Sequence, residues 1–438
     1  MSFFYYLSTT NHETHIMQKK SNAWLWIPTL YFASGLPYHA ITSISDIMYK
    51  DMSIDNAHIT LYTSLLLIPW TIKPLWSPIV EMISTRRKWT LASQLLLAIS
   101  FAAIALVIPS THFLTLTLIA FFVGAFISST HDIALDGFYI LGLPQEKQSF
   151  FSGIRNTFYR IATVFGSGVL VILAHSITKN GGNIRFAWST TFAITGAIML
   201  ALYLYNRKVM PIPEKDLPRK GSIRDAFANY GDILKSYFQK PGISQAILFL
   251  LLFRFPEAQL GKMSKLFLMD STNAGGLALD KGDIGFIYGV VGVIGLIIGG
   301  IVGGICISRK GLKYWLWPMV IAISLPDAVY IYMSMELPDN LNIIGSCIFT
   351  EQLGYGFGFT AYTLYMIYIA QGKYPTAHFA ISTAFMSLGM MLPGMFAGQL
   401  QEWWGYENFF IWVTACTIIT FIVSALIKID PGFGKRGK

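Results

Sequence analysis

Long apolar runs that are nearly free of charge dominate the chain. A helix that crosses the hydrocarbon core of a membrane needs about 20 mostly apolar residues. Twelve runs of this length lie at residues 23–45, 58–80, 89–109, 113–141, 150–175, 185–206, 242–266, 284–308, 314–335, 341–370, 377–400 and 406–428. The sequence therefore predicts an all-α membrane protein with twelve transmembrane helices.

Composition and charge placement support this class. Only 13% of the 438 residues are charged, against about 25% in soluble domains, which excludes a soluble protein and a disordered one. The net charge of +9 is placed mostly in segments that share one side of the membrane if the N-terminus is cytoplasmic. Lys and Arg favour the cytoplasmic side, so both termini are predicted there, with the lipid bilayer rather than a nucleic acid as the partner.

A long polar segment divides the chain into two sets of six runs. The predicted domains are a cytoplasmic tail, an N-terminal six-helix bundle, a cytoplasmic linker and a C-terminal six-helix bundle with a short cytoplasmic tail, at residues 1–22, 23–206, 207–241 and 242–438. The tail lacks the apolar core of a signal peptide, and both Met1 and Met17 are candidate starts. Within the linker, residues 222–238 fit an amphipathic surface helix or a solvated linker.

The two sets resemble each other weakly. The first run of each set carries a proline at a comparable depth, Pro37 and Pro256. Two parallel six-helix repeats with a substrate site between them describe the major facilitator fold, which is the predicted architecture. Each proline is either an ordinary kink or a bend that frees backbone groups near the midplane.

Acidic and basic residues face each other in the fourth and fifth runs. Asp132 and Asp136 share one helix face, since they are four residues apart, and an antiparallel hairpin places Asp136 level with Arg155 and Asp132 level with Arg160. Because Arg155 and Arg160 are about 140° apart on a helix, both pairs cannot be ideal together. We interpret Asp136–Arg155 as a structural clamp and Asp132–Arg160 as functional.

Other intramembrane charges suggest pairs or proton carriers. Lys73 lies between Trp70 and Trp76, which predicts a cation–π contact, and Arg254 and Glu257 are placed to pair. Three carboxyl groups are candidates for proton coupling, because a carboxyl group in an apolar site can hold a proton near neutral pH. They are Glu351 first, then Asp132 and Glu257, with helix-to-helix hydrogen bonding as the competing explanation; Asp327 is similarly isolated.

Hydroxyl and aromatic side chains suggest a binding surface and not a catalytic one. Tyr31, Ser34, Tyr38 and Thr42 form a polar stripe in the first run, and Tyr355 follows Glu351 by one turn. These groups suit an amphiphilic or glycan-like anionic solute. Gly295, Gly299 and Gly303 are four apart, which indicates close helix packing. The sequence has no catalytic triad, phosphate loop, metal-ligand spacing or cysteine pair, so we predict no enzyme activity, metal or cofactor.

Several motifs together resemble one family. They are FASGLP (32–37), KPLWSPIVE (73–81) followed by RRKW, SSTHDIALDGF (128–138), TFYR (157–160), EQLGYGFGFTAY (351–362) and HFAISTAF (378–385). Over roughly residues 25–428 the chain resembles the AmpG-like muropeptide permeases of the major facilitator superfamily, which are related to acetyl-CoA transporters. His131 stands where these permeases usually have Gln, and RFPE (254–257) replaces their usual pattern.

The resemblance implies a multi-pass inner-membrane importer of anhydro-muropeptides or related amino sugars, driven by protons and working by alternating access. We expect the protein to be a monomer. Carried over by motif, it points to Ser34, Gly35, Lys73, Asp132, Asp136, Arg160 and Glu351. With the residue-based candidates Tyr38, Trp70, Tyr355, Arg155, Arg254 and Glu257, these form the predicted site. The alternatives are a transporter of the same fold for an oligosaccharide, a nucleotide conjugate or a siderophore, and a transport-inactive membrane sensor.

Overall fold

The computed structural model describes residues 22–143, 145–213, 216–217, 223–372 and 374–435. Within them every regular element is a helix and none is a strand, which confirms the all-α class. Of the predicted tail only Asn22 is described. Residues 214–215 and 218–222 of the predicted linker also lie outside the described part.

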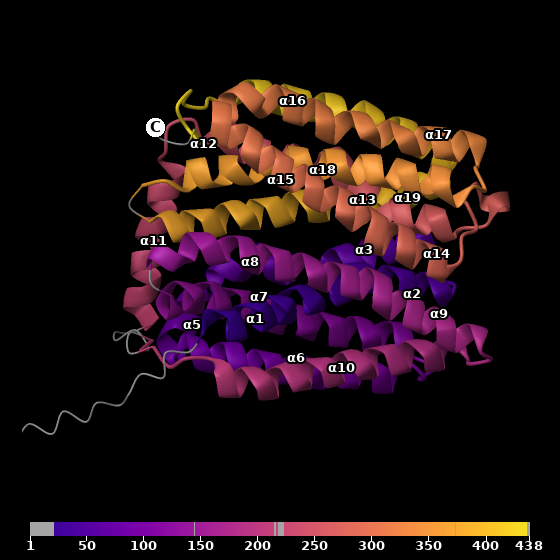
Figure 1. Ribbon diagram of the computed structural model, residues 1–438, viewed down its shortest axis with the longest axis horizontal. Coiled ribbons are helices and arrows are strands. Elements are labelled where there is room, and N and C mark those ends of the chain that lie inside the picture. The colour runs from indigo at the N-terminus through magenta and orange to yellow at the C-terminus, as the bar shows by residue number, and fades with distance from the viewer. Residues whose placement is uncertain (1–21, 144, 214–215, 218–222, 373, 436–438) are drawn as a thin grey trace, which may run out of the picture.

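The first half of the chain forms one layer of long, roughly antiparallel helices, coloured indigo to magenta in Figure 1. In chain order its elements are α1 (Ala23–His39), η1 (Ala40–Ile44), α2 (Ser45–Asp51), α3 (Asn56–Leu65), α4 (Ile68–Ile72), η2 (Lys73–Leu75), α5 (Ser77–Ile83), α6 (Arg86–Val107), α7 (Phe113–Gly142), α8 (Gln145–Val164), η3 (Phe165–Leu170), α9 (Val171–Lys179) and α10 (Ile184–Val209).

The second half forms the other layer, coloured orange to yellow (Figure 1). Its elements are α12 (Ile243–Leu252), α13 (Phe255–Met269), η4 (Thr272–Ala274), α14 (Lys281–Phe286), η5 (Ile287–Gly292), α15 (Val293–Lys310), α16 (Leu312–Ser324), η6 (Leu325–Ala328), α17 (Val329–Glu336), α18 (Leu341–Ala370) and α19 (Pro375–Leu426). Helix α11 (Ile223–Phe238) lies between the two halves in the sequence, and it contacts α5 of the first half and α19 of the second. The part of the linker for which the sequence predicted either an amphipathic helix or a solvated linker is thus helical over Ile223–Phe238.

Eight helical stretches among the described residues are long and apolar enough to cross a membrane. The last of them, Ala377–Leu426, holds 50 residues, about 75 Å of helix, which is too long for one crossing. Its helical path breaks at Gly405, where φ is 73°. The predicted spans at 23–45, 58–80 and 341–370 are not among the eight, so the count of twelve stays a prediction. These three carry Ser34, Lys73 and Glu351, and polar groups of this kind lower the apolarity of a helix.

The halves make polar contacts with each other at the end away from α11, where α2, α9, α13 and α14 meet in Figure 1. We call this the α2–α14 end. Lys281 of α14 pairs with Asp51 of α2, 2.7 Å between Nζ and Oδ2. Lys50 pairs with Asp270, which follows α13, and the Asn56 amide donates to the same Asp270 carboxylate at 3.0 Å. Helices α2 and α3 of the first half are therefore tied to the second half at one end.

Beside these ion pairs the two backbones touch directly. Gly168 lies in the π-helical turn η3 and Gly289 in the π-helical turn η5. A Cβ atom on Gly289 would lie 2.7 Å from both the Cα and the N of Gly168. Only glycine permits this approach.

The glycine stripe of α15 packs against α18. A Cβ on Gly295 would lie 2.7 Å from the Phe349 carbonyl oxygen, and one on Gly303 would lie 3.0 Å from that of Phe357. Gly304, on the outer face of the same helix, has no neighbouring atom within 4 Å. The stripe is thus a close helix contact of the kind common in membranes.

We predict that Gly295→Leu lowers the yield of folded protein, because the larger side chain forces α15 and α18 apart. The yield of monodisperse protein after detergent extraction measures this. Gly304→Leu is the matched control, since its side chain meets open space. Equal yields from the two variants would contradict the packing interpretation.

Candidate functional site

Asp132 of α7 is the carboxylate at which three helices of the first half meet. Its Oδ1 accepts a hydrogen bond from the Ser34 hydroxyl of α1 at 2.7 Å, and its Oδ2 accepts one from the Trp70 indole of α4 at 3.0 Å. The ring of Tyr38, one turn after Ser34, packs edge-on against Trp70 with the centroids 5.1 Å apart. Four of the predicted residues therefore form one polar and aromatic surface.

Gly35 has a different place from the one that the resemblance implies. A Cβ at this position would lie 2.8 Å from the Tyr159 carbonyl oxygen and 2.9 Å from the Ala162 Cβ. Gly35 therefore allows α1 to pack closely on α8, and the geometry favours this packing role over direct contact with a solute.

Asp136 and Arg155 form the pair that the antiparallel hairpin predicts. Arg155 Nη1 lies 3.7 Å from Asp136 Oδ1, and the two side chains are 31% and 59% exposed. The Arg155 guanidinium also lies over the rings of Tyr31 and Tyr139, 5.5 and 5.0 Å from their centroids. An exposed pair at this distance contributes little energy, so the aromatic contacts hold Arg155 as much as the carboxylate does.

The predicted ion pair between Asp132 and Arg160 is wrong. In the described part of the chain Arg160 makes no salt bridge, and its Nη2 instead comes within 3.7 Å of where a Cβ on Gly300 of α15 would lie. Residues 155 and 160 point about 140° apart on α8. Once Arg155 faces Asp136, Arg160 therefore faces the second half of the protein.

The predicted cation–π contact of Lys73 is also absent from the described residues. Lys73 begins a short 3₁₀ turn, which rotates it away from its neighbours on α4. The Trp70 indole turns to Asp132, and the Trp76 indole donates to Thr130 at 3.2 Å. Lys73 stays half-buried and within electrostatic range of Asp132, where it compensates the carboxylate.

Arg254 and Glu257 form a buried, two-pronged ion pair in the second half. Arg254 Nε and Nη2 donate to the two Glu257 oxygens at 2.5 and 2.7 Å, and Nη2 also donates to the Tyr355 hydroxyl at 2.8 Å. The guanidinium lies 4.8 Å from the centroid of the Phe359 ring. This pairing matches the interpretation of the three-residue spacing.

The Arg254–Glu257 pair lies where the helix is interrupted between α12 and α13. Pro256 has no N–H, so it cannot continue the hydrogen-bond ladder from α12, and α13 starts again at Phe255 with Arg254 at its N-cap. Carbonyl groups near the break find other donors, since Tyr362 donates to the Leu250 oxygen at 2.6 Å and Thr420 to that of Phe253 at 3.0 Å. Pro256 thus positions a charged pair where neighbouring helices satisfy the backbone, as membrane proteins require.

The surfaces of the two halves face each other. Tyr38 of α1 is within electrostatic range of Arg254 and Glu257, and Tyr355 of α18 is within range of Arg160 and Tyr38. A direct link lies beside them, where the Thr71 hydroxyl donates to that of Ser387 at 3.0 Å. Residues predicted from distant parts of the sequence thus form one candidate site between the halves.

Glu351 occupies a separate position. It is 6% exposed, and its carboxylate accepts a hydrogen bond from the Gln352 amide at 2.8 Å. Its acidic neighbours are Asp327 and Glu257. Glu351 therefore lies inside the second half, among groups that the sequence pattern did not bring together.

Sequence reasoning missed the charged groups at the α2–α14 end. Lys262 is buried on α13, and its Nζ lies 3.3 Å from Asp46 of α2. Lys265 reaches the Ser43 hydroxyl of the other half. The available signal was the spacing of Asp46 and Lys50, which places both on one helix face.

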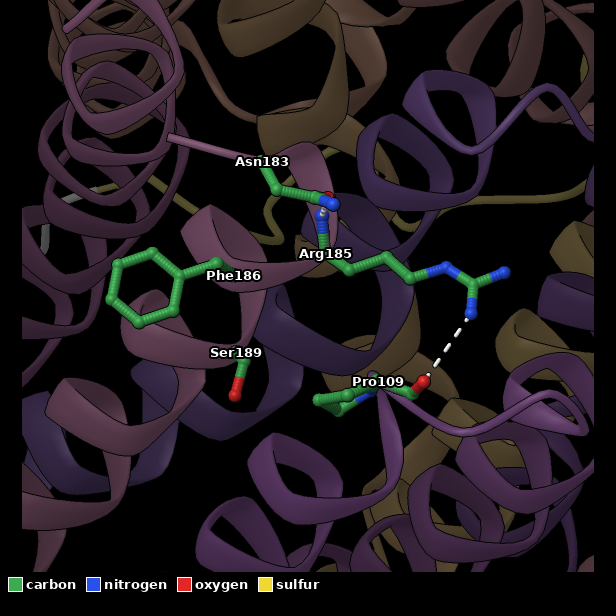
Figure 2. Close-up of a pocket in the computed structure, with 5 residues that line it drawn as sticks. All are labelled: Pro109, Asn183, Arg185, Phe186 and Ser189. Carbon is green, nitrogen blue, oxygen red and sulfur yellow. Dashed lines mark hydrogen bonds between the residues drawn. The ribbon is translucent and has the colours of Figure 1, made fainter. Parts of the chain in front are cut away.

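A pocket of about 480 Å³ lies elsewhere, on the surface between the end of α6 and the start of α10. Figure 2 shows the Arg185 side chain extending to the Pro109 carbonyl, a hydrogen bond of 3.3 Å, while Phe186 points away. Arg185 also lies 4.9 Å from the Phe113 ring centroid. The guanidinium of Arg185 is therefore already bound by the segment between α6 and α7. None of the residues that line this pocket belongs to the predicted site.

Comparison with known proteins identifies the family. Residues 29–391 match the Major Facilitator Superfamily. The chain belongs to this superfamily. A Rickettsia conorii protein designated transporter AmpG 4 is 26% identical over 395 residues, covering 87% of this chain and 91% of that protein. The anhydromuropeptide permease of Escherichia coli K12 is 25% identical over 410 residues, covering 92% and 79%.

Solved structures of the superfamily share the fold. A nucleoside transporter, NupG, aligns with a TM-score of 0.66 at 16% identity, over 93% of this chain and all of that one. A D-xylose–proton symporter aligns at 0.67 and 12%, over 92% and 96%. The chain is therefore an AmpG-like member of the superfamily, a multi-pass membrane transporter of a small molecule rather than an enzyme.

We predict that Arg254→Met destabilises the transporter, because it leaves the Glu257 carboxylate buried without its partner. Losing one member of a buried pair costs about 3–5 kcal/mol. Thermal unfolding of the detergent-purified protein measures this loss.

The double variant Arg254→Met/Glu257→Gln removes the unpaired charge and recovers part of the stability. Single and double variants that both unfold at the temperature of the original protein would contradict the pairing.

Proposed function

We propose that the protein imports anhydro-muropeptides or related amino sugars across the inner membrane by proton-coupled alternating access, as a monomer with both termini in the cytoplasm. The observation that carries this proposal is the surface that the two halves share, with Tyr38 and Arg160 on one side and Arg254 and Tyr355 on the other. A permease for anhydromuropeptides among the relatives supports the solute class.

The chemistry of the shared surface suits this solute. Muropeptides combine sugar rings, amides and carboxylates. Tyrosine and tryptophan rings pack on apolar faces and offer a polar group at the edge, and a guanidinium binds a carboxylate through two parallel hydrogen bonds. Arg254 is already bonded to Glu257, whereas Arg160 makes no ion pair among the described residues, so we assign the solute carboxylate to Arg160.

The contacts between the halves support alternating access. The described ion pairs between the halves gather at the α2–α14 end, away from α11 in the predicted cytoplasmic linker. A carrier that opens toward one side must be closed at the other. This arrangement therefore corresponds to a state closed on the outer side.

We predict that Arg160→Gln weakens binding of a labelled anhydro-muropeptide to the purified protein. A hydrogen bond to a charged group contributes about 1.5–3 kcal/mol, so the dissociation constant should rise about 10–100-fold. Asp132→Asn should weaken binding as well, because Asp132 orients Ser34 and Trp70. Equilibrium dialysis provides the measurement.

Arg309→Gln is the matched control, since Arg309 is an exposed arginine at the end of α15. In intact cells, accumulation of the labelled solute should stop when a protonophore is added. No binding of anhydro-muropeptides, together with binding of an oligosaccharide or a nucleotide conjugate in the same assay, would replace this function with the alternative solute.

We predict that Asp270→Asn loosens the α2–α14 end, because Asp270 accepts from Lys50, Asn56 and Tyr406. Spin labels on exposed Ser53 and Ser271, in a protein without its three cysteines, report the separation of the halves. The distance distribution should move to longer values.

Glu407→Gln, at an exposed position of the same end, should leave the distances unchanged. A distribution that Asp270→Asn does not alter would contradict a role for these ion pairs in closing the outer side.

A further inference from the structure

A second buried polar group lies away from the shared surface, at a break in the helical rod formed by α16 and α17. The α-helix ends at Ser324, and residues 325–328 form the 3₁₀ turn η6 with Pro326 at its start. Asp327 lies in this turn and is 3% exposed. A broken helix that leaves polar groups inside a membrane protein is a common setting for coupling ions.

Helix α18 packs against this break through a glycine. A Cβ on Gly354 would overlap the Ala322 carbonyl oxygen and lie 2.8 Å from the Pro326 ring. Glu351 is one turn earlier on the same face of α18, and its carboxylate lies within electrostatic range of Asp327. Two buried carboxyl groups from different elements therefore lie within electrostatic range of each other.

A negative charge on Asp327 would receive little stabilisation from hydrogen bonds. In the described part of the chain Asp327 Oδ2 has no hydrogen-bond partner, and neither has the buried hydroxyl of Ser324 in the preceding turn. Glu351 receives the Gln352 amide at 2.8 Å. This one amide donor binds Glu351 and not Asp327, which is too little to stabilise two negative charges away from water.

Aromatic hydroxyls and a third carboxylate complete the surroundings. The hydroxyls of Tyr288 in η5 and Tyr330 in α17 are 2.6 Å apart, and both lie within electrostatic range of Glu351. Glu257 of α13 is also within range of Asp327 and Glu351. None of these groups supplies a positive charge.

The nearby cations are engaged elsewhere. Arg254 is bound to Glu257 by two hydrogen bonds. Lys265 of α13 lies 5.6 Å from the Tyr288 ring centroid and donates to Ser43 of the other half. The two carboxyl groups thus lack a cation of their own, and an uncompensated charge inside a membrane is costly.

We propose that Asp327 and Glu351 together retain one proton at neutral pH, and that this proton is the one whose movement drives transport. The inference rests on the function proposed above. It assigns the coupling site to the second half of the protein. Asp132 is less suited to this task, because Ser34, Trp70 and the nearby Lys73 already stabilise its charge.

The position of the carboxyl pair also connects it to the movement of the halves. When the shared proton leaves, the two carboxyl groups gain a negative charge, which attracts cations in their surroundings. Lys265 lies over the ring of Tyr288 and contacts Ser43 across the boundary between the halves. Loss of the proton therefore weakens a contact that holds the α2–α14 end together.

The first test needs no solute. Infrared spectra of the purified protein, recorded across a pH titration, report the C=O band of a protonated carboxyl group. The band should persist to neutral pH in the original protein and be lost in both Asp327→Asn and Glu351→Gln. Asp339→Asn, an exposed carboxylate in the loop after α17, should leave it unchanged. A neutral-pH band that survives in both variants overturns the proposal.

The second test separates coupling from binding. In proteoliposomes, both amide variants should keep the exchange of labelled for unlabelled anhydro-muropeptide and lose accumulation driven by a proton gradient. Accumulation at the original rate in both variants, or accumulation driven by a sodium gradient instead, overturns the proposal. If the original protein exchanges no anhydro-muropeptide, the proposed function fails, and the infrared titration still decides the shared proton.

Discussion

The cost of placing charge inside a lipid bilayer governs this structure. Unpaired charges facing lipid are too costly to retain, so each buried charge must find a partner, a hydrogen bond or a place between the halves. Arg254 and Glu257 pair with each other, and Asp132 accepts hydrogen bonds from Ser34 and Trp70. Arg160 lies between the halves and faces the second one. The candidate site lies where these three groups come together.

Departures from regular helix geometry gather at the same places. The turn η1 follows Pro37, η3 and η5 touch each other, and η6 holds Asp327. A π-helical or 3₁₀ turn frees backbone groups and redirects side chains, which a membrane tolerates only where protein covers the backbone. The irregular turns therefore lie where helices are buried against other helices, and they aim polar side chains at positions that a straight helix would not reach.

Sequence reasoning succeeded where the interaction is local. The apolar runs indicated the all-α membrane class, and a spacing of three residues predicted the Arg254–Glu257 contact. It failed where the partner comes from far away in the chain. Lys262 meets Asp46 across 216 residues, a partner that hydropathy cannot reveal. The Asp132–Arg160 pair failed for another reason, because equal depth in a hairpin does not fix the rotation of a helix about its axis.

The contact between Gly168 and Gly289 has a consequence for how fast the two halves can separate and rejoin. Neither residue has a side chain, so nothing at this point must change rotamer or interdigitate when the surfaces part. Rejoining them orders no side chain there and incurs no side-chain entropy loss. In the alternating-access cycle proposed above, the ion pairs around this contact, rather than local repacking of side chains, would set the rate at which the halves move.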